Sequence, residues 1–390
     1  MSGRPAVAFV NNSRETFTPT VSGAIATCIH EVGRVAIAEG FDVPVITRPA
    51  DAEPHPWPAL RTTSPIRNHR PFETKALRVR RRLNGWARPD QWAYAREVVS
   101  ELEALRPQAV VVSNDPEIAV FLRRRLPATR VVHWFHNLEM ASDRFRRRFA
   151  ADPDLRSVAV SGYLARAVEQ VYQLTPLSVS AVLNGVDAER FTTERRSQLV
   201  TVGYLGRLAV EKAPDTLLEA CLRLAERGTR FRLQLVGDTN FGFSSGNFFV
   251  DRLYAQVAEL QAAGVEVVRT GHLARADIAD ALSRSDIHVT PSRWDEPCAL
   301  TLLEGMASGQ VVVGSATGGT PELLDEGGLL FPRDDTQALA DVLDGLIRDR
   351  GARSSWGQRA RARAESLTWE RTWDGLAQAA GIRRQHHERA

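Results

Sequence analysis

The segment 289–314 constrains the fold of this chain more than any other part of the sequence. An apolar run at residues 286–290 predicts a strand, and a turn with two acidic residues follows it. Residues 299–308 then predict a short helix that Gly309 ends, and a second apolar run predicts another strand. This order of strand, helix and strand is typical of an α/β domain with a parallel sheet.

Two carboxylates, Glu296 and Glu304, flank the start of the predicted helix, with seven residues between them. A helix N-terminus that follows a parallel strand offers unpaired N–H groups and partial positive charge, which suit a phosphate group. Glu304, one turn into the helix, can reach a ribose hydroxyl. The segment is therefore typical of a nucleotide-sugar site.

Three further motifs accompany this pair of acids. Gly318-Gly-Thr-Pro-Glu322 follows the pair, and Gly206-Arg-Leu-Ala-Val-Glu-Lys212 and Asn184-Gly-Val-Asp187 precede it. In this order the four motifs resemble those of the retaining GT-B glycosyltransferases of family four, most strongly over residues 180–332. The resemblance implies an α/β chain with two Rossmann-like parallel-sheet domains that face a cleft.

The length of 390 residues suits two domains. We place an acceptor-side domain at residues 1–186 and a nucleotide-sugar-binding domain at residues 187–366. Residues 367–390 contain an amphipathic helix, which in the family returns to the first domain. Asn184-Gly-Val-Asp187 marks the hinge, although Asn-Gly is also a common turn pair.

The resemblance also implies a reaction. A hexose-type sugar passes from a nucleotide diphosphate sugar to an acceptor hydroxyl with retention at the anomeric carbon. A UDP-sugar is the expected donor, a GDP-sugar is the alternative, and the acceptor is unknown. Glu296 would hold sugar hydroxyls, Glu304 the ribose, and Arg207 with Lys212 the diphosphate.

Arg207 and Lys212 lie on one predicted loop, where two cations can neutralise charge on a leaving diphosphate. Exposed loop charges are the alternative explanation for such a pair. Lys212 is conspicuous because only Lys75 and Lys212 are lysines among the 50 basic residues, a bias that indicates a GC-rich, bacterial genome.

No metal or other cofactor is expected. The one Asp-x-Asp motif, Asp152-Pro-Asp154, lies in a predicted turn, and no His, Cys and acidic residues have metal-ligand spacing. The leaving-group charge would then be met by Arg207, Lys212 and the helix-start amides near residues 299–301.

The candidate site residues form two groups. The catalytic candidates are His136, Glu296, Arg207 and Lys212. The nucleotide-sugar-binding candidates are Gly23, Gly206, Arg207, Lys212, Gly271, His272, Leu273, Glu296, Pro297, Cys298, Ala299, Leu300, Thr301 and Glu304. Many family members have Phe-Gly shortly after the first acid, whereas this chain has Pro297-Cys-Ala299, so its backbone approach to sugar hydroxyls differs.

Two candidates precede the hinge. His136 lies at the end of a predicted strand, where open α/β sheets bind ligands, and in the family a histidine at such a place sits beside the reacting sugar. A packing role is the alternative for His136 and the expectation for His133. Gly23 lies near the start of a predicted helix. It can let the backbone approach a phosphate, or it can simply allow the backbone conformation that joins the loop to the helix.

Two features bear on the acceptor and other partners. Residues 49–71 contain six prolines and are expected to form a long irregular loop, either for acceptor recognition or as a disordered insertion. Basic runs at Lys75–Arg82 and Arg144–Arg148 can contact anionic lipid or a phosphorylated acceptor, or can be solvated helix faces. Residues 1–190 carry 26 Lys and Arg against 20 Asp and Glu, which favours an anionic partner for that half. No nucleic acid partner is expected.

The sequence has three cysteines and neither a leader nor an apolar run long enough to span a bilayer. We therefore expect a cytoplasmic protein, with a peripheral place at the inner face of the membrane as an option. Three classes of function stay open: a transferase for natural-product glycosides or cell-envelope glycans, an epimerase or phosphorylase-like enzyme of the same fold, and a catalytically silent sugar-nucleotide-binding protein.

Overall fold

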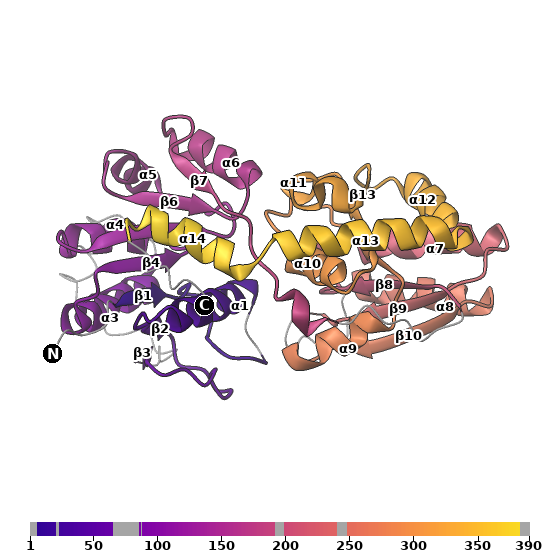
Figure 1. Ribbon diagram of the computed structural model, residues 1–390, viewed down its shortest axis with the longest axis horizontal. Helices are drawn as coiled ribbons and strands as arrows, with labels where there is room; N and C mark the ends of the chain where they lie inside the picture. Colours follow the sequence, from indigo (N-terminus) through magenta and orange to yellow (C-terminus); the bar gives the residue numbers. More distant parts are fainter. Residues whose placement is uncertain are drawn as a thin grey trace, which may run out of the picture. The chain divides into compact units, whose positions relative to one another are not determined.

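The computed structural model describes residues 6–20, 23–64, 86, 88–191, 199–239 and 248–382. It divides into two compact units, each with one parallel sheet flanked by helices (Figure 1). The first unit comprises Met1–Leu183 and Trp369–Ala390, and the second comprises Asn184–Thr368.

The first unit has a seven-stranded parallel sheet in the order β3-β2-β1-β4-β5-β6-β7. Strands β1 and β4 are buried along their whole length, because helices cover both faces of the sheet. The strands are β1 (Val7–Val10), β2 (Val45–Thr47), β3 (Leu60–Thr62), β4 (Ala109–Ser113), β5 (Arg130–Phe135), β6 (Arg156–Ala159) and β7 (Val179–Ala181). The helices are α1 (Ala24–Ala38), α3 (Pro89–Leu105), α4 (Pro116–Arg125), α5 (Asp143–Ala150), α6 (Gly162–Tyr172) and α14 (Trp369–Ala379).

Helix α14 is an integral part of the first unit. Trp373 is completely buried and its Nε1 donates to Glu39 Oε2 at 2.9 Å. Thr372 Oγ1 donates to the carbonyl oxygen of Leu183 at 3.0 Å. A Cβ on Gly375 would lie 2.4 Å from Val182 Cγ2, so the helix approaches the sheet closely at this residue. A chain segment distant in sequence therefore completes the core of this unit.

The expected irregular loop at residues 49–71 contains a strand, so that expectation was wrong in part. Strand β3 pairs in parallel with β2 at the edge of the sheet, where Val45 lies opposite Leu60. It forms in the proline-free stretch between Pro58 and Pro65, and an edge strand needs hydrogen bonds on one side only.

The second unit has a six-stranded parallel sheet in the order β10-β9-β8-β11-β12-β13. The strands are β8 (Thr201–Leu205), β9 (Arg232–Val236), β10 (Glu266–Gly271), β11 (Ile287–Thr290), β12 (Val311–Ser315) and β13 (Leu329–Phe331). The α-helices are α7 (Pro214–Glu226), α8 (Phe248–Ala262), α9 (Ile278–Ser283), α10 (Leu300–Ala307), α11 (Thr320–Leu324), α12 (Thr336–Arg348) and α13 (Arg350–Ser366). Short 3-10 helices are η1 (Ala188–Arg190), η2 (Val210–Lys212), η3 (Arg275–Asp277) and η4 (Asp325–Gly327).

The strand order of each sheet reverses direction at one point, between β1 and β4 in the first unit and between β8 and β11 in the second. Open parallel sheets bind ligands outside the carboxyl ends of the strands at such a point, because the connecting loops leave it in opposite directions. Both positions are therefore candidate sites. Within the described residues, no helix combines the length and the hydropathy needed to cross a membrane.

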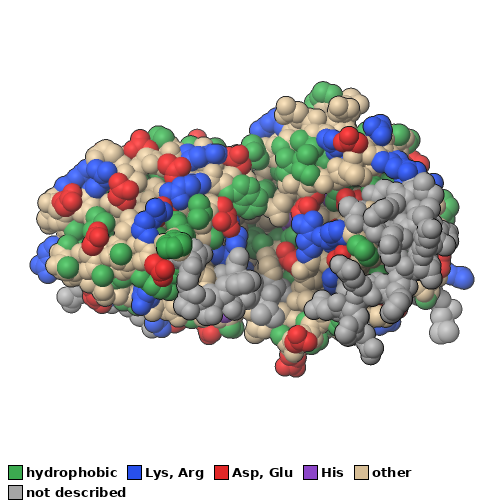
Figure 2. Space-filling model, turned by 180° about the vertical axis from the view of Figure 1, so that it is seen from behind, with side chains coloured by type: hydrophobic (Ala, Val, Ile, Leu, Met, Phe, Trp, Pro, Cys, Tyr) green, Lys and Arg blue, Asp and Glu red, His purple; other side chains and the backbone are tan. Residues whose placement is uncertain are grey.

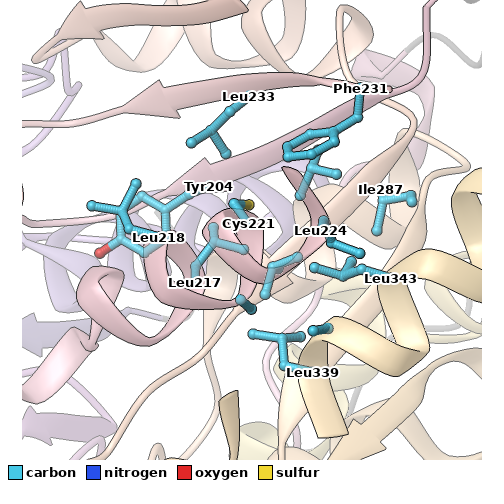
Figure 3. Close-up of a cluster of buried hydrophobic side chains, with 14 of the residues drawn as sticks. Tyr204, Leu217, Leu218, Cys221, Leu224, Phe231, Leu233, Ile287, Leu339 and Leu343 are labelled. Carbon is cyan, nitrogen blue, oxygen red and sulfur yellow. The ribbon is translucent and has the colours of Figure 1, made fainter. Parts of the chain in front are cut away.

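The core of the second unit lies between the sheet and helices α7 and α12 (Figure 3). Leu217, Cys221 and Leu224 recur at helical spacing on one face of α7 and are completely buried. They pack in one cluster with Leu339 and Leu343 of α12. This packing fixes the first turn of α7, next to the loop that carries Lys212.

We expect Leu224→Ala to lower the free energy of unfolding by about 2–5 kcal/mol, because it removes a buried side chain and leaves a cavity. Leu330→Ala is the matched control, since Leu330 is 40% exposed. Urea unfolding followed by circular dichroism measures both. An equal loss of stability in the two variants would contradict the assignment of Leu224 to the core.

Candidate active site

Lys212 and Glu296 meet at the carboxyl edge of the second sheet, at its reversal point. Lys212 ends η2, in the loop after β8, and Glu296 lies in the loop after β11. Lys212 Nζ donates to Glu296 Oε1 at 2.5 Å, and the two side chains are 22% and 6% exposed. The structure thus joins two residues that lie 84 positions apart in the sequence.

Glu296 is held on several sides. Ser292 Oγ donates to Glu296 Oε1 at 2.5 Å. The backbone N–H of Gly319 donates to the carbonyl oxygen of Glu296 at 2.7 Å. Gly318 has a φ of +55°, and a Cβ there would lie 2.5 Å from the carbonyl oxygen of Glu296, so only glycine fits. The Gly318-Gly319 pair therefore supports the acid directly.

Arg207 lies in the same loop as Lys212 but has a more open environment. Its Nη2 lies 2.7 Å from Glu211 Oε1, and both side chains are 42% exposed. Tyr204 Oη donates to the carbonyl oxygen of Arg207 at 2.6 Å. The ring of Trp294 lies 5.2 Å from Lys212 Nζ, which adds a cation–π contact on the Lys212 side of the loop.

Glu304, in α10, is buried and forms an ion pair with Arg275 of η3. Sequence reasoning missed Arg275, which follows the Gly271-His-Leu273 segment by two residues. Each of the two acids therefore has its own cationic partner. Helix α10 begins at Leu300, and no side chain in the described part of the chain caps its N-terminus at Ala299. The first-turn amides, including that of Thr301, therefore receive no capping bond from the side chain of Ala299.

Three glycines lie at the carboxyl ends of neighbouring strands. Gly206 follows β8, Gly237 follows β9, and Gly271 ends β10. A Cβ on Gly237 would lie 1.9 Å from the carbonyl oxygen of Gly206, and Gly237 N–H donates to the carbonyl oxygen of Gly271 at 2.8 Å. Gly237 was not among the sequence candidates. Of the two residues that follow Gly271, His272 is exposed and Leu273 is half-buried.

The segment after Glu296 is packed more tightly than its position in a loop suggests. Pro297 and Cys298 are buried, and burial raises the pKa of the Cys298 thiol to about 12. Cys298 is therefore a neutral packing residue at physiological pH. Ala299, which follows them, is half-buried.

His136 follows β5 in the first unit and is almost completely buried. Its backbone N–H donates to Asn114 Oδ1 at 2.9 Å, and its ring lies 4.3 Å from that of Trp134. Burial lowers the pKa of His136 to about 3, so the imidazole is neutral at pH 7. Its Nε2 has no hydrogen-bond partner among the described residues. His133 is also buried and packs against Phe135, as expected for a core residue.

The structure has a polar network at the reversal point of the first sheet, and none of its residues was a candidate from the sequence. Asp115 is buried, and its carboxylate accepts from the Ser13 N–H at 2.5 Å and from Gln91 Nε2 at 2.7 Å. Burial raises the pKa of Asp115 to about 6. Asn12 Nδ2 donates to the carbonyl oxygen of Asn114 at 3.1 Å. The network ties the loop after β1 to the loop after β4.

Gly23 precedes α1, and the carboxylate of Glu15 occupies the space beside it. A Cβ on Gly23 would lie 2.9 Å from Glu15 Oε1. Burial raises the pKa of Glu15 to about 7, although its bond to the backbone at Ala26 opposes this shift. The helix start predicted to receive a phosphate therefore faces an acidic side chain in this structure.

The basic run Arg144–Arg148 forms most of α5, while the run Lys75–Arg82 lies outside the described residues. Phe145 and Phe149 of α5 point into the unit and are buried, whereas Arg144 and Arg147 are exposed. The outer face of this helix is therefore basic. Among the described residues, no group of His, Cys, Asp and Glu side chains is arranged to hold a metal ion.

Two family matches cover most of the chain. Residues 186–363 match the family described as Glycosyl transferases group 1, and residues 25–190 match the family described as Glycosyltransferase Family 4. The structure is similar to that of Anabaena HepE in complex with UDP and glucose, with a TM-score of 0.72 over 96% of this chain and 99% of that chain, at 19% identity. At this identity the likeness concerns the fold.

Two curated proteins are also similar. Spore coat protein SA of Bacillus subtilis (strain 168) is 26% identical over 310 residues, which cover 74% of this chain and 81% of that protein. A D-inositol 3-phosphate glycosyltransferase of Saccharomonospora viridis is 29% identical over 309 residues, which cover 75% of this chain and 65% of that protein. The family matches, the two parallel-sheet units and these relatives support a group 1 type glycosyltransferase with a GT-B fold.

Proposed function

We propose that this chain is a retaining, metal-independent glycosyltransferase that uses a nucleotide diphosphate sugar. The Lys212–Glu296 pair at the reversal point of the second sheet is the main support, and Glu304 follows Glu296 by eight residues, in α10. A cation for a diphosphate and an acid for sugar hydroxyls must lie next to each other, because the diphosphate is bonded directly to the sugar.

The proposed donor is a UDP-sugar, and a GDP-sugar is the alternative. A structural relative that holds UDP and glucose supports the first choice. We propose that the ribose lies against Glu304, and that backbone groups of Gly206 and of the Gly271-His272-Leu273 segment contact the nucleotide. The first-turn amides of α10 would then face the diphosphate.

In the proposed reaction, the bond between the anomeric carbon and the phosphate oxygen breaks and the acceptor oxygen bonds to that carbon on the same face. The acceptor proton passes to the leaving phosphate oxygen. Lys212 and Arg207 stabilise the negative charge that builds on the diphosphate. Glu296 orients the sugar, and the neutral His136, with its unpartnered Nε2, can bond to a sugar hydroxyl.

The proposed acceptor is a hydroxyl compound of natural-product glycoside or cell-envelope glycan biosynthesis. The name of the inositol phosphate glycosyltransferase to which the chain is similar makes a phosphorylated polyol a reasonable first trial. On the part of the surface coloured by residue type in Figure 2, basic and acidic side chains are interspersed.

Release of nucleotide diphosphate tests the proposal. The assay combines UDP-glucose, UDP-N-acetylglucosamine and GDP-mannose separately with a panel of hydroxyl acceptors that includes D-inositol 3-phosphate. Proton NMR of the product then gives the anomeric configuration. Epimerised donor without diphosphate release would favour the epimerase alternative, and binding without turnover would favour a silent protein. Inversion at the anomeric carbon would refute the retaining mechanism.

We also propose that the basic face of α5 contacts an anionic membrane surface on the cytoplasmic side. The Arg144→Gln/Arg147→Gln variant should bind phosphatidylglycerol vesicles about 30-fold more weakly than the parent, because each arginine near the surface contributes about 1 kcal/mol. Vesicle sedimentation measures this binding. Arg230→Gln/Arg350→Gln, which removes two exposed arginines of the second unit, is the control. Equal weakening in both variants would mean that general charge, and not α5, drives the binding.

A further inference from the structure

Arg293 uses all of its side-chain hydrogen-bond donors within the second unit. Nε donates to Asp334 Oδ1 at 2.5 Å, and Nη1 donates to Asp215 Oδ1 at 2.8 Å and to the carbonyl oxygen of Val210 at 3.2 Å. Nη2 donates to Asp215 Oδ2 at 2.8 Å and to Thr216 Oγ1 at 3.1 Å. These five bonds match the five N–H groups of a guanidinium.

The partners of Arg293 surround the Lys212 loop in sequence. Val210 lies two residues before Lys212, and Asp215 and Thr216 lie in the first turn of α7, just after it. Asp215 is only 12% exposed, and its two oxygens receive the guanidinium as a bidentate pair. Such a pair fixes direction as well as distance, because the guanidinium is planar.

The backbone of the same segment is attached to the same loop. The N–H groups of Arg293 and Trp294 both donate to the carbonyl oxygen of Glu211, at 3.0 and 3.2 Å. Glu211 is the neighbour of Lys212, and Glu296 lies three residues beyond Arg293. Side-chain and backbone bonds therefore join the loop after β8 to the loop after β11 at the point where Lys212 Nζ meets Glu296 Oε1.

We propose that Arg293 is a positioning residue. It fixes the positions of Lys212 and Glu296 relative to each other, as donor binding requires, and does not contact the donor itself. All of its N–H groups are already committed to protein oxygens, so it has none left for a ligand. Lysine cannot replace it, since an ammonium group cannot form the planar bidentate pair with Asp215. This inference rests on the proposed function of Lys212 and Glu296.

The test compares Arg293→Lys with Arg348→Lys. Arg348 is a matched control in the same unit, because its Nε contacts both oxygens of Asp344 at 2.9 Å and its Nη2 donates to Thr229 Oγ1. We expect Arg293→Lys to weaken UDP binding about tenfold in calorimetry and to lower diphosphate release at saturating donor by about 10²-fold, since small misplacements of catalytic groups are costly. Arg348→Lys should change neither value by more than about twofold, as is usual for an exposed ion pair.

The same substitution in a Lys212→Ala background separates positioning from a general structural role. If Arg293 acts through Lys212 and Glu296, Arg293→Lys should add less than about twofold to the defect of Lys212→Ala, because coupled residues are not additive. Wild-type behaviour of Arg293→Lys, or its full effect in the Lys212→Ala background, would overturn the proposal.

A crystal structure of Arg293→Lys tests the positioning role of Arg293 even if the chain neither binds UDP nor releases diphosphate. In that case the proposed function fails, but the position of Lys212 can still be compared. Separation of Lys212 Nζ from Glu296 would support the positioning role. An unchanged ion pair between Lys212 and Glu296 would refute it.

Discussion

Glu296→Gln should lower turnover by about 10²–10³-fold while UDP affinity stays the same or rises slightly. The carboxylate is proposed to contact the sugar and not the nucleotide, so its loss affects the reacting sugar. In the ligand-free structure Glu296 also pairs with Lys212 at 2.5 Å. The amide cannot neutralise Lys212, which is then more available to a diphosphate.

Steady-state kinetics and UDP calorimetry on the same protein check both parts of this prediction. Glu326→Gln, which changes an exposed acid of η4, is the control. A loss of UDP affinity as large as the loss of turnover would show that Glu296 binds the nucleotide. Thermal unfolding should accompany these measurements, because Ser292 Oγ would lose a charged acceptor.

Lys212→Ala and Arg207→Ala should each reduce the rate by about 10²–10³-fold, or about 3–4 kcal/mol in the barrier, while EDTA leaves the activity intact. In the proposed mechanism fixed cations stabilise the negative charge on the diphosphate, so the loss of either side chain slows the reaction. Lys212→Ala should have the larger effect, because Lys212 is 22% exposed and paired with a buried acid, whereas Arg207 is 42% exposed. Lys212→Arg should also be impaired, since a planar fork does not replace a compact ammonium.

The measurement is steady-state kinetics on dialysed protein, with chelator, with added Mg²⁺ and with added Mn²⁺. A strict requirement for either metal would refute the metal-independent mechanism. A near-normal rate of the Lys212→Ala/Arg207→Ala double variant would show that other groups stabilise the leaving diphosphate.

The sequence predicted the parallel-sheet fold and the main motifs because these depend on local patterns. Apolar runs of four to six residues form buried strands, as in β4 and β11. The short helix α10 ends just before Gly309, as the sequence predicted. The spacing of Glu296 and Glu304 also identified the loop and helix that carry them. Each of these features is determined by neighbours within one strand or one helix turn.

Partners that come from distant segments were not predictable in this way. Arg275 pairs with Glu304, and Arg293 binds Asp215 and Asp334, but no local pattern in an arginine-rich chain distinguishes these arginines from the others. Gly237 became significant only when β8 and β9 were placed side by side. Such contacts depend on strand order, which no single segment of sequence contains.

The position of α14 has a consequence for how the protein is made. The second unit is one continuous stretch, Asn184–Thr368, whereas the first unit needs Trp369–Ala390 to complete its core around Trp373. Domains fold as units during synthesis, and a continuous stretch can fold as soon as it has left the ribosome. The segment that is synthesised first therefore belongs to the unit that is completed last, and until then Phe41 and Glu39 lack their partner on α14.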